Sequence, residues 1–400
     1  MSSRSPLLHP FALADRQNEL DRGMTARYPH LFERKRARLL LSPHSFLRGS
    51  APLFHEILAA RPDLAGGPAG DGWIVGDMHM ENVGAYQTDT KGEVVFNLND
   101  FDDATIGPLY LDVLRLSTSV LLAGRTFQCS GVESIALVET TIRAYLQGAW
   151  DLAPAPPWPA TIAAMVERAA RRTRKDLLDG RAPVGPDGQR RFVRGERYFD
   201  LPPDLAPEIP RLIGAYLTAL GDRAPAHTAS WSIDDAALRI AGTGSLGVRR
   251  IAVLVRDKDN DQRIVELKEA RPSSTESLLQ PPEGAWQTPA ERVVLGARAL
   301  VGSPPRQLAP VNDDGRSFAA RKLFPQEDKL RLDALRAGPK LDAIATTIGD
   351  LLGRAHARSA RNRPETPWSP AETSAVIDHA IELAGIFEGV YLAYVRSDAR

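Results

Sequence analysis

Cysteine is nearly missing from this sequence, which contains Cys129 alone. An intrachain disulfide and a zinc site of the C-x-x-C type are therefore excluded. The chain also lacks an excess of charge of either sign, because 50 Lys and Arg residues balance 50 Asp and Glu residues. We therefore expect no long-range attraction to nucleic acid or to an anionic membrane.

Long apolar runs are missing as well. No uninterrupted apolar stretch reaches about 18 residues, the length that predicts a membrane-spanning helix. The N-terminal segment 1–20 mixes Arg, His, Asp and Glu and contains no apolar run of signal-peptide length. These absences predict a cytoplasmic protein that does not contact the membrane.

The residues that are present make up an ordinary globular composition, with 43% hydrophobic and 25% charged residues. A chain of 400 residues has room for two to three domains of about 150 residues. Helical spacing of apolar residues prevails toward both ends of the chain, whereas short β-rich segments prevail between them. We therefore expect an α+β fold with a mostly helical large lobe at 1–225, a small antiparallel β lobe at 226–330, and C-terminal helices at 331–400 that complete the large lobe.

Apolar periodicity also predicts where the main elements lie. The expected helices are 54–60, 109–122, 132–152, 162–178, 289–301, 341–360 and 371–395. The expected strands are 73–75, 94–98, 237–241, 248–255 and 263–270, with two more within 308–324 around an N-D-D-G turn. Residues 42–49 break the helical pattern and could form a loop.

The most informative signal lies at the ends of two short predicted strands. Asp77 and Asn82 follow the first strand in the form D-x-x-x-x-N, and the N-D-F-D-D sequence follows the second. Phosphoryl transfer needs a carboxylate that orients the nucleophile and oxygen ligands that hold Mg²⁺ on the phosphates. We therefore assign Asp77, Asn82 and Asp100 to catalysis. The expected metal ligands are Asn82, Asp100 and Asp102.

A plainer interpretation of these segments is also open. Asp and Asn are favoured in turns, so both could be Asx-rich turns that cap strands. Asp102 is either a second carboxylate at the metal or a solvated cap.

A second signal is the G-x-G-x-x-G sequence at 242–247. A dinucleotide-binding fingerprint would lead into a helix, but here a strand follows. Strand, glycine loop, strand, turn and strand in succession are typical of the hairpin that covers the nucleotide in kinases. Gly242, Gly244, Ser245 and Gly247 are therefore expected to bind the nucleotide. The alternative is a tight β-turn without a ligand.

The last strand of this hairpin contains Lys268, a candidate phosphate-binding lysine. The helix expected at 289–301 offers Glu291 as the ion-pair partner of Lys268, although Glu276 and Glu283 are also near in the sequence. In the simpler interpretation Lys268 is an exposed strand residue.

The kinase elements occur in an unusual order, because the catalytic and metal-binding residues precede the glycine loop and the lysine. Residues 76–82 resemble the G-D-x-H-x-x-N motif of aminoglycoside-phosphotransferase-like kinases, and 99–113 resemble their I-D-F-x-x-A, G-x-P and D-L-A series. Residues 352–359 resemble the L-x-x-L-H helix that precedes their catalytic loop. The chain as a whole resembles the bacterial domain-of-unknown-function family 2252. These resemblances imply a circularly permuted, protein-kinase-like fold of two lobes.

The motifs and resemblances together imply an ATP- and Mg²⁺-dependent phosphotransferase that acts on a small-molecule or protein acceptor. In this hypothesis Asp77 orients the acceptor hydroxyl. Two alternatives stay open: nucleotidyl transfer on the same scaffold with the nucleotide reversed, and a nucleotide-binding interaction module without catalysis. Nucleic acid is not an expected partner, because the charge is balanced and the basic run at 168–197 lacks a series of aromatic residues for base stacking.

Other polar residues are expected to have supporting roles. Asp112 should anchor the backbone of the catalytic loop, whereas His79 and His356 should pack or form hydrogen bonds. Arg48 is either a phosphate contact or part of a surface salt bridge. The basic run at 34–38 is expected to be a solvated helix face.

Overall fold

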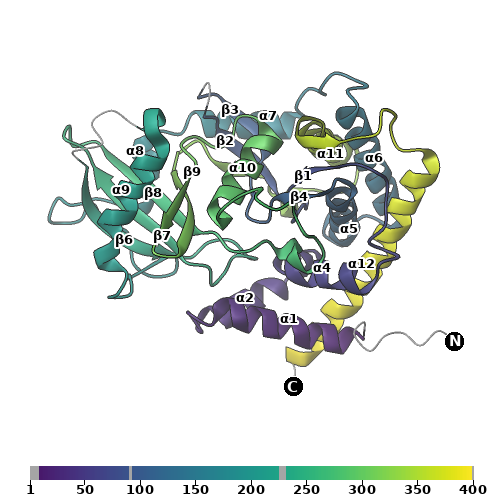
Figure 1. The fold of residues 1–400 in the computed structure, drawn as a ribbon, viewed down its shortest axis with the longest axis horizontal. Coiled ribbons are helices and arrows are strands. Elements are labelled where there is room, and N and C mark those ends of the chain that lie inside the picture. The colour runs from purple at the N-terminus through teal and green to yellow at the C-terminus, as the bar shows by residue number, and fades with distance from the viewer. Residues whose placement is uncertain (1–8, 90–91, 225–230, 399–400) are drawn as a thin grey trace.

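The computed structural model describes residues 9–89, 92–224 and 231–398, and the fold is of the mixed α+β type (Figure 1). Its helices are α1 (Pro10–Thr25), α2 (Leu31–Leu39), α3 (Pro43–Gly49), α4 (Ala51–Ala60), α5 (Tyr110–Phe127), α6 (Gly131–Ala149), α7 (Ala160–Ala170), α8 (Arg174–Arg181), α9 (Ile209–Leu220), α10 (Pro289–Val301), α11 (Pro339–Ser359) and α12 (Pro370–Asp398). Its strands are β1 (Asp71–Ile74), β2 (Val83–Gln87), β3 (Val94–Leu98), β4 (Thr105–Pro108), β5 (Tyr198–Phe199), β6 (Ser232–Arg239), β7 (Arg250–Arg256), β8 (Gln262–Glu269), β9 (Ala309–Asp313), β10 (Arg316–Lys322), β11 (Asp328–Lys329) and β12 (Ala360–Asn362).

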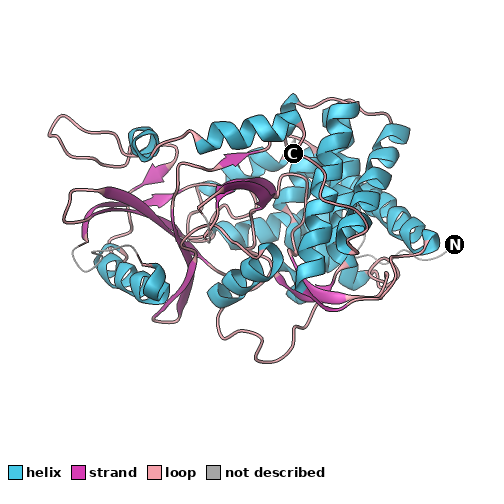
Figure 2. Cartoon of the chain, turned by 90° about the horizontal axis from the view of Figure 1, so that it is seen from above, coloured by secondary structure: helices cyan, strands magenta, loops and turns pink. Residues whose placement is uncertain are grey.

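One six-stranded antiparallel sheet dominates the β-rich part, and Figure 2 shows the strands in magenta. Its strand order is β5-β6-β7-β8-β10-β9. Its central strand β7 is apolar without alternation because both faces of the sheet are covered. Ile251, Val253 and Val255 pack in a core that includes α9, whereas Ala252 and Leu254 pack in a second core with part of α8. A short continuous apolar run is what a strand buried on both sides requires.

The largest hydrophobic core lies among the helices, including α5, α6, α11 and α12. Glycines let α6 and α11 approach each other closely. A Cβ atom at Gly349 would clash with the Thr141 carbonyl oxygen, and one at Gly353 would clash with the Tyr145 carbonyl oxygen. Close packing of these two helices therefore depends on the absence of side chains at two positions one turn apart.

Two small antiparallel sheets, β12-β1-β4 and β11-β2-β3, connect the distant parts of the chain. In the first, β12 directly follows α11 and pairs with β1. In the second, β11 follows the strands of the large sheet and pairs with β2. The polar loops that follow β1 and β3 are thus placed between the helical core and the large sheet.

Most of the elements expected from the sequence are present, so the α+β class is confirmed. The bounds of β3 and α10 are those predicted, and β9 and β10 flank the N-D-D-G turn. The antiparallel succession of β6, β7 and β8 is also confirmed. The long helices expected near the C-terminus are α11 and α12.

The loop considered at 42–49 is wrong, because these residues form the short helix α3. The Ser42 side chain accepts a hydrogen bond of 3.0 Å from the Ser45 N–H and so caps the helix. Phe46 and Leu47 are fully buried. Capping and burial together outweigh the breaking effect of the flanking proline and glycine.

The single helix expected at 162–178 is also wrong, since the chain forms two helices, α7 and α8. Thr173 caps the second helix through reciprocal hydrogen bonds with Asp176. The β-rich part also recruits segments that precede residue 226, because β5 pairs with β6 and α9 packs on the sheet. The division into lobes at 225 and 330 stays a prediction.

No helix in the described part of the chain combines the length and the apolar character that spanning a bilayer would require.

Candidate functional site

Most of the polar residues predicted for the site meet between the large sheet and the helical core. They line two adjoining cavities of about 200 and 590 Å³ that share the residues Asp100, Asp102, Gly242, Ser245 and Lys329. We call the cavity of about 200 Å³ the outer cavity, and it also contains Asp77, Asn82 and Gly244. We call the cavity of about 590 Å³ the inner cavity, and it also contains Lys268. Gly247 and Glu291 line neither of them.

The loop after β1 is held from behind by a buried carboxylate. Asp112, near the start of α5, accepts hydrogen bonds from the backbone N–H groups of Val75 and Gly76 at 2.6 and 2.9 Å. His356 of α11 lies 3.1 Å from the same carboxylate and 3.2 Å from the Tyr145 hydroxyl through its other ring nitrogen. The expected roles of Asp112 and His356 as buried structural residues are confirmed, and the loop that carries Asp77 is fixed.

Asp77 faces the outer cavity and is bound by one arginine. The Arg115 guanidinium donates twice to Oδ1 of Asp77, with Nε at 2.7 Å. Arg115 is fully buried and lies over the Phe54 ring. Burial raises the pKa of Asp77 to about 7, against the opposing effect of the Arg115 charge. In the described part of the chain no hydrogen bond reaches Oδ2 of Asp77, which leaves one carboxylate oxygen for a ligand.

Asn82 links the two polar loops. Its side-chain N–H group donates to the Asp77 carbonyl oxygen at 3.0 Å and, weakly, to the Asp100 carbonyl oxygen at 3.5 Å. With the amide nitrogen used in this way, the amide oxygen is the atom left for a ligand in the cavity. Asn82 is buried, so its position is fixed.

Lys268 of β8 meets the carboxylates of the loop after β3. Its ammonium forms an ion pair with Asp102 and lies 3.7 Å from Oδ1 of Asp100. Burial lowers the pKa of Lys268, and the Asp100 charge opposes that effect. Burial would raise the pKa of Asp100, but Lys268, Lys329 and Arg250 bring it below its ordinary value. The lowered pKa of Asp100 keeps this carboxylate ionised at neutral pH.

The expected ion pair between Lys268 and Glu291 is not formed in the described part of the chain. The Glu291 carboxylate instead accepts a hydrogen bond of 2.8 Å from the Gln287 N–H, at the start of α10. Acidic side chains are favoured in the first turn of a helix, and the Glu291 carboxylate interacts there rather than with Lys268. The carboxylates of Asp100 and Asp102 take its place beside the lysine.

The glycine loop between β6 and β7 is held by helices from the N-terminal part of the chain. Lys35 of α2 donates to the Gly244 carbonyl oxygen at 3.1 Å, and Arg38 donates to that of Gly242. Lys35 is almost fully buried and forms an ion pair of 2.8 Å with Asp21 of α1. The expectation that the basic run at 34–38 is a solvated helix face is therefore wrong, since two of its side chains bind the glycine loop.

Two of the three loop glycines have backbone conformations that other residues avoid. Gly242 has a φ of +81° and Gly247 a φ of +99°. A Cβ atom at Gly247 would also clash with the Met24 carbonyl oxygen of α1. Gly244 has ordinary φ, and a Cβ atom there would lie 3.3 Å from the Arg48 carbonyl oxygen. The glycines thus serve both the turn and the close approach of the N-terminal helices.

The face of the sheet that forms the roof of the inner cavity is rich in arginine. Glu266 of β8 is almost fully buried and forms an ion pair with Arg239 of β6. Arg250 and Arg321 lie 3.9 and 3.7 Å from the same carboxylate. Burial lowers the pKa of Arg239 to about 9 and that of Arg250 to about 10. Arg321 also pairs with Glu327 at 2.9 Å, so three guanidinium groups share two carboxylates and leave an excess of positive charge.

The side chains present are suited to Mg²⁺ that is also bound to phosphate. The described residues contain no group of three or more His, Cys, Asp or Glu side chains that could hold a metal. Asp100, Asp102 and the Asn82 amide offer hard oxygen ligands at one edge of the cleft. Mg²⁺ is usually bound by one or two carboxylates and completes its shell with water and phosphate oxygens. The donor set therefore fits a metal–nucleotide complex better than a free ion.

Arg115, Lys35 and the arginine roof are site features that the sequence interpretation missed. Arg115 lies one helical turn after Asp112, so the two share a face of α5, which is a signal that could have been read. Glu266 lies two positions before Lys268 on β8, so both side chains face the cleft. Nothing in the sequence indicates that Lys35 lies beside the glycine loop, because that contact joins segments about two hundred positions apart.

Arg48 and His79 also lie at the outer cavity. Arg48 forms an ion pair of 2.6 Å with Glu81, and both side chains are about three-quarters buried. The predicted salt bridge of Arg48 is therefore present, although it lies at the cavity and not on the open surface, and the phosphate contact stays a prediction. His79 accepts a hydrogen bond of 3.1 Å from the Glu81 N–H through Nδ1, and burial holds its pKa well below the ordinary value.

Comparison with known proteins places the chain in one family. A family profile described as "Uncharacterized protein conserved in bacteria (DUF2252)" matches residues 27–396, which is almost the whole chain. No curated protein and no solved structure gave a significant match.

Proposed function

The chain belongs to this DUF2252 family of bacterial proteins, and we propose that it is an ATP- and Mg²⁺-dependent phosphotransferase with a kinase-like, circularly permuted arrangement. The observation that carries the proposal is the meeting of Asp77, Asn82, Asp100 and Lys268 at one cleft beside a glycine loop. These groups come from segments far apart in the sequence. Turn capping explains the two Asx-rich loops one at a time, but it does not explain why a largely buried lysine of the large sheet pairs with the second of these loops.

Asp77 is the residue that would orient the acceptor hydroxyl. Arg115 holds one carboxylate oxygen, so the other can accept the hydroxyl proton as the oxygen attacks the γ-phosphorus. The bond between the γ-phosphorus and the bridging oxygen then breaks, and ADP leaves. A pKa raised to about 7 suits a group that must take and return a proton near neutral pH.

Lys268, Asp100 and Asp102 would change partners when the nucleotide binds. Without nucleotide, Lys268 pairs with Asp102 and lies near Asp100. A phosphate group offers the ammonium another anion, which frees carboxylate oxygens for the metal. Mg²⁺, when bound there, would neutralise charge on the phosphates. The Asn82 amide oxygen is placed to join the same set of ligands.

Nucleotidyl transfer is the second candidate, and the arginine roof favours it. A kinase normally offers an adenine ring a mostly apolar pocket, as small-molecule sites do in general. Here Arg239, Arg250 and Arg321 line the larger of the two cavities. If the nucleotide were reversed, its β- and γ-phosphates would lie below these arginines. The acceptor would then attack the α-phosphorus, with pyrophosphate as the leaving group and Asp77 as the proton acceptor.

One experiment tests both candidates. Thermal unfolding of the wild-type protein would be followed with ATP, GTP and Mg²⁺, and the products from a metabolite extract would be identified by mass spectrometry. A gain of phosphoryl on the acceptor with ADP indicates the first candidate, and a gain of AMP with pyrophosphate indicates the second. We expect ATP with Mg²⁺ to raise the melting temperature.

Lys268→Ala should abolish that stabilisation, because the phosphates lose their cationic contact. Lys258→Ala is the matched control, since Lys258 is an exposed lysine in the turn of the same hairpin. A Lys268→Ala protein stabilised by ATP as strongly as the wild type would contradict the nucleotide site.

A further inference from the structure

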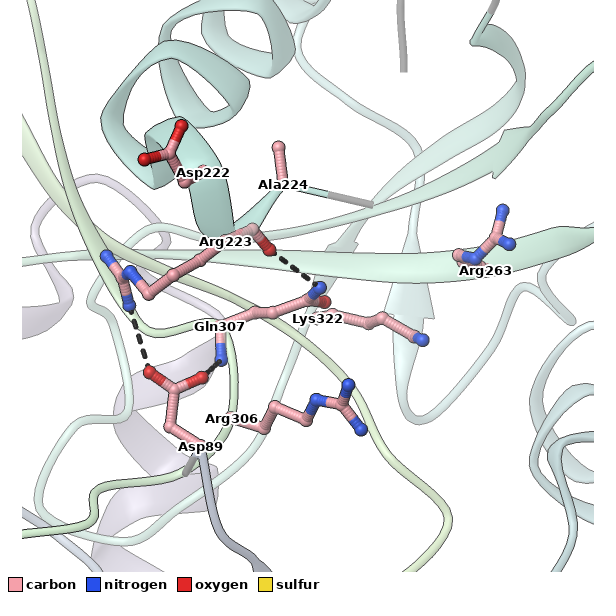
Figure 3. A pocket seen from close by; sticks show the side chains of 8 residues that line it. All are labelled: Asp89, Asp222, Arg223, Ala224, Arg263, Arg306, Gln307 and Lys322. Atoms are coloured by element: carbon pink, nitrogen blue, oxygen red, sulfur yellow. Dashed lines mark hydrogen bonds and ion pairs between the residues drawn. The ribbon is translucent and has the colours of Figure 1, made fainter. Parts of the chain in front are cut away.

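A second polar cavity lies on the other side of the large sheet. It has a volume of about 630 Å³ and is formed by the segment after α9, Asp89 after β2, the segment before β9 and the strands β8 and β10 (Figure 3). Side chains alternate along a strand, so Arg321 faces the inner cavity while its neighbour Lys322 faces this second cavity. A volume in this range is typical of a site for a small organic molecule.

Two cations in this cavity have no carboxylate partner among the described residues. Arg306 and Lys322 lie over the same ring, that of Phe324, at 5.8 and 4.4 Å from its centroid. Figure 3 shows their side chains extending in the same direction across the cavity. Burial and the nearby charges of Arg263, Arg174 and Arg306 together lower the pKa of Lys322 to about 8. A bound anion would relieve this repulsion.

Three of the remaining charged groups at the cavity, Arg263, Asp89 and Arg223, are already paired. The Asp222 carboxylate is exposed and extends away from Arg306 and Lys322 (Figure 3). Arg263 forms an ion pair of 2.5 Å with Asp257, outside the cavity. Asp89 is held between Arg223 at 3.1 Å and the Gln307 N–H at 3.0 Å, as the dashed lines in Figure 3 mark. Because Asp89 is satisfied on both oxygens, it does not neutralise Arg306 or Lys322.

Gln307 adds an acceptor to the same cavity. Its side chain is more than nine-tenths buried, and its amide oxygen has no hydrogen-bond partner, whereas its amide nitrogen donates to the Arg223 carbonyl oxygen at 3.4 Å. Its backbone has a φ of +59°, a left-handed conformation that is rare for a residue other than glycine. An unsatisfied buried acceptor and a strained backbone are both features that concentrate at ligand sites.

We propose that this cavity binds a phosphorylated, hydroxylated small molecule, with Arg306 and Lys322 holding the phosphoryl group and the Gln307 amide oxygen accepting a hydroxyl hydrogen. A phosphate monoester carries close to two negative charges at neutral pH, which matches two cations without partners. The volume exceeds that of phosphate alone and leaves room for a sugar-sized group. This site is independent of the phosphotransferase cleft, because the sheet separates the two.

Titration calorimetry on the full chain tests the proposal with three probes: ribose 5-phosphate, inorganic phosphate and ribose. We expect ribose 5-phosphate to bind more tightly than phosphate, and ribose not to bind. Arg306→Gln and Lys322→Met should each raise the Kd of ribose 5-phosphate about tenfold or more, because each removes a charge-assisted contact. Absence of saturable binding by the phosphorylated probes at millimolar concentration would overturn the proposal.

Three further variants separate the roles. Lys175→Gln removes an exposed lysine that is paired with Asp179 and should leave binding unchanged. Lys268→Ala alters the phosphotransferase cleft and should also leave the binding of ribose 5-phosphate unchanged. Loss of binding in this variant would assign the probe to the phosphotransferase site. Gln307→Asn suits the left-handed backbone and should remove only the advantage of ribose 5-phosphate over phosphate. Equal loss for both probes would overturn the role of Gln307.

Discussion

The Lys268 ammonium lies 3.7 Å from the Asp100 carboxylate, although β8 belongs to the large sheet and Asp100 follows β3 in the helical part. This contact crosses the cleft between the two parts. A ligand that contains both a phosphate and a metal would replace this contact with two separate interactions, phosphate with Lys268 and metal with Asp100. Loss of the contact between Lys268 and Asp100 would therefore indicate that such a ligand is bound.

The first prediction contrasts the two carboxylates. Asp100→Asn should raise the Kd of ATP with Mg²⁺ about tenfold, because a neutral amide is a poorer ligand for a hard cation. Asp77→Asn should leave that Kd within about twofold but reduce turnover by about 10²- to 10⁴-fold, since general-base effects have that size. Calorimetry and steady-state rates on both variants measure the contrast. Equal loss of binding would show that Asp77 and Asp100 do not have different roles.

The second prediction concerns pH. The pKa of Asp77 is raised from 3.8 to about 7 by burial, so the folded state takes up a proton that the unfolded state releases between these values. This group therefore stabilises the fold at low pH, and its contribution falls as pH rises from 3.8 to 7, by at most about 1.4 kcal/mol per pH unit. Activity should rise over the upper part of the same range, because the carboxylate is the active form.

Urea unfolding and rate measurements between pH 5 and 8 check both trends, with Asp77→Asn as the control that should remove the pH dependence of stability near pH 6. A similar rise in activity through pH 7 in a variant of another residue would be compatible with Asp77 as the proton acceptor. A wild-type rate that is flat from pH 5 to 8 would contradict that assignment.

The third prediction separates the glycines of the loop. Gly247→Ala should destabilise the protein by more than about 2 kcal/mol, because a left-handed backbone and a clash with the Met24 carbonyl act together. Gly315→Ala is the matched control, since Gly315 has a φ of +72° but open space around it, and should cost only about 1 kcal/mol. Gly244→Val should lower the stability less than Gly247→Ala does, but it should raise the KM for nucleotide strongly. Urea unfolding gives the first two values.

If Gly315→Ala and Gly247→Ala cost the same, the contact between the glycine loop and α1 contributes nothing beyond the backbone conformation. If Gly244→Val lowers stability without changing the nucleotide KM, the loop is a structural turn and not a nucleotide-binding element.

The fourth prediction concerns the N-terminal helices. Lys35→Met should destabilise the protein by about 3–5 kcal/mol, because it leaves the buried Asp21 carboxylate without its partner. Burial already raises the pKa of Asp21, and removal of the Lys35 charge would raise that pKa further. The double variant Lys35→Met with Asp21→Asn should recover much of the stability.

Recovery of stability in the double variant need not restore function. Because the Gly244 carbonyl would still lack its contact with Lys35, nucleotide-dependent stabilisation should remain below that of the wild type. A double variant whose melting temperature rises with ATP as much as that of the wild type would show that α2 supports only the fold.

The sequence was informative wherever the physical cause is local. The periodicity of 289–301 and the short, mostly apolar segment 94–98 predicted α10 and β3 with their observed bounds. The sequence was misleading at 42–49, where a serine cap and two buried side chains form a helix despite a proline and a glycine. It was also misleading at Glu291, since the first turn of a helix competes with a distant lysine for the same carboxylate.

By itself the sequence determined the α+β class, the polar loops after two short strands, and the candidate residues Asp77, Asn82, Asp100 and Lys268. Only the tertiary structure decided that Asp100 and Asp102, rather than Glu291, lie beside Lys268, and that Lys35 and Arg115 belong to the site. The reason is physical. Turn chemistry and apolar spacing act over a few residues, whereas the choice of an ion-pair partner is made when packing brings distant segments together and removes water from around their charges.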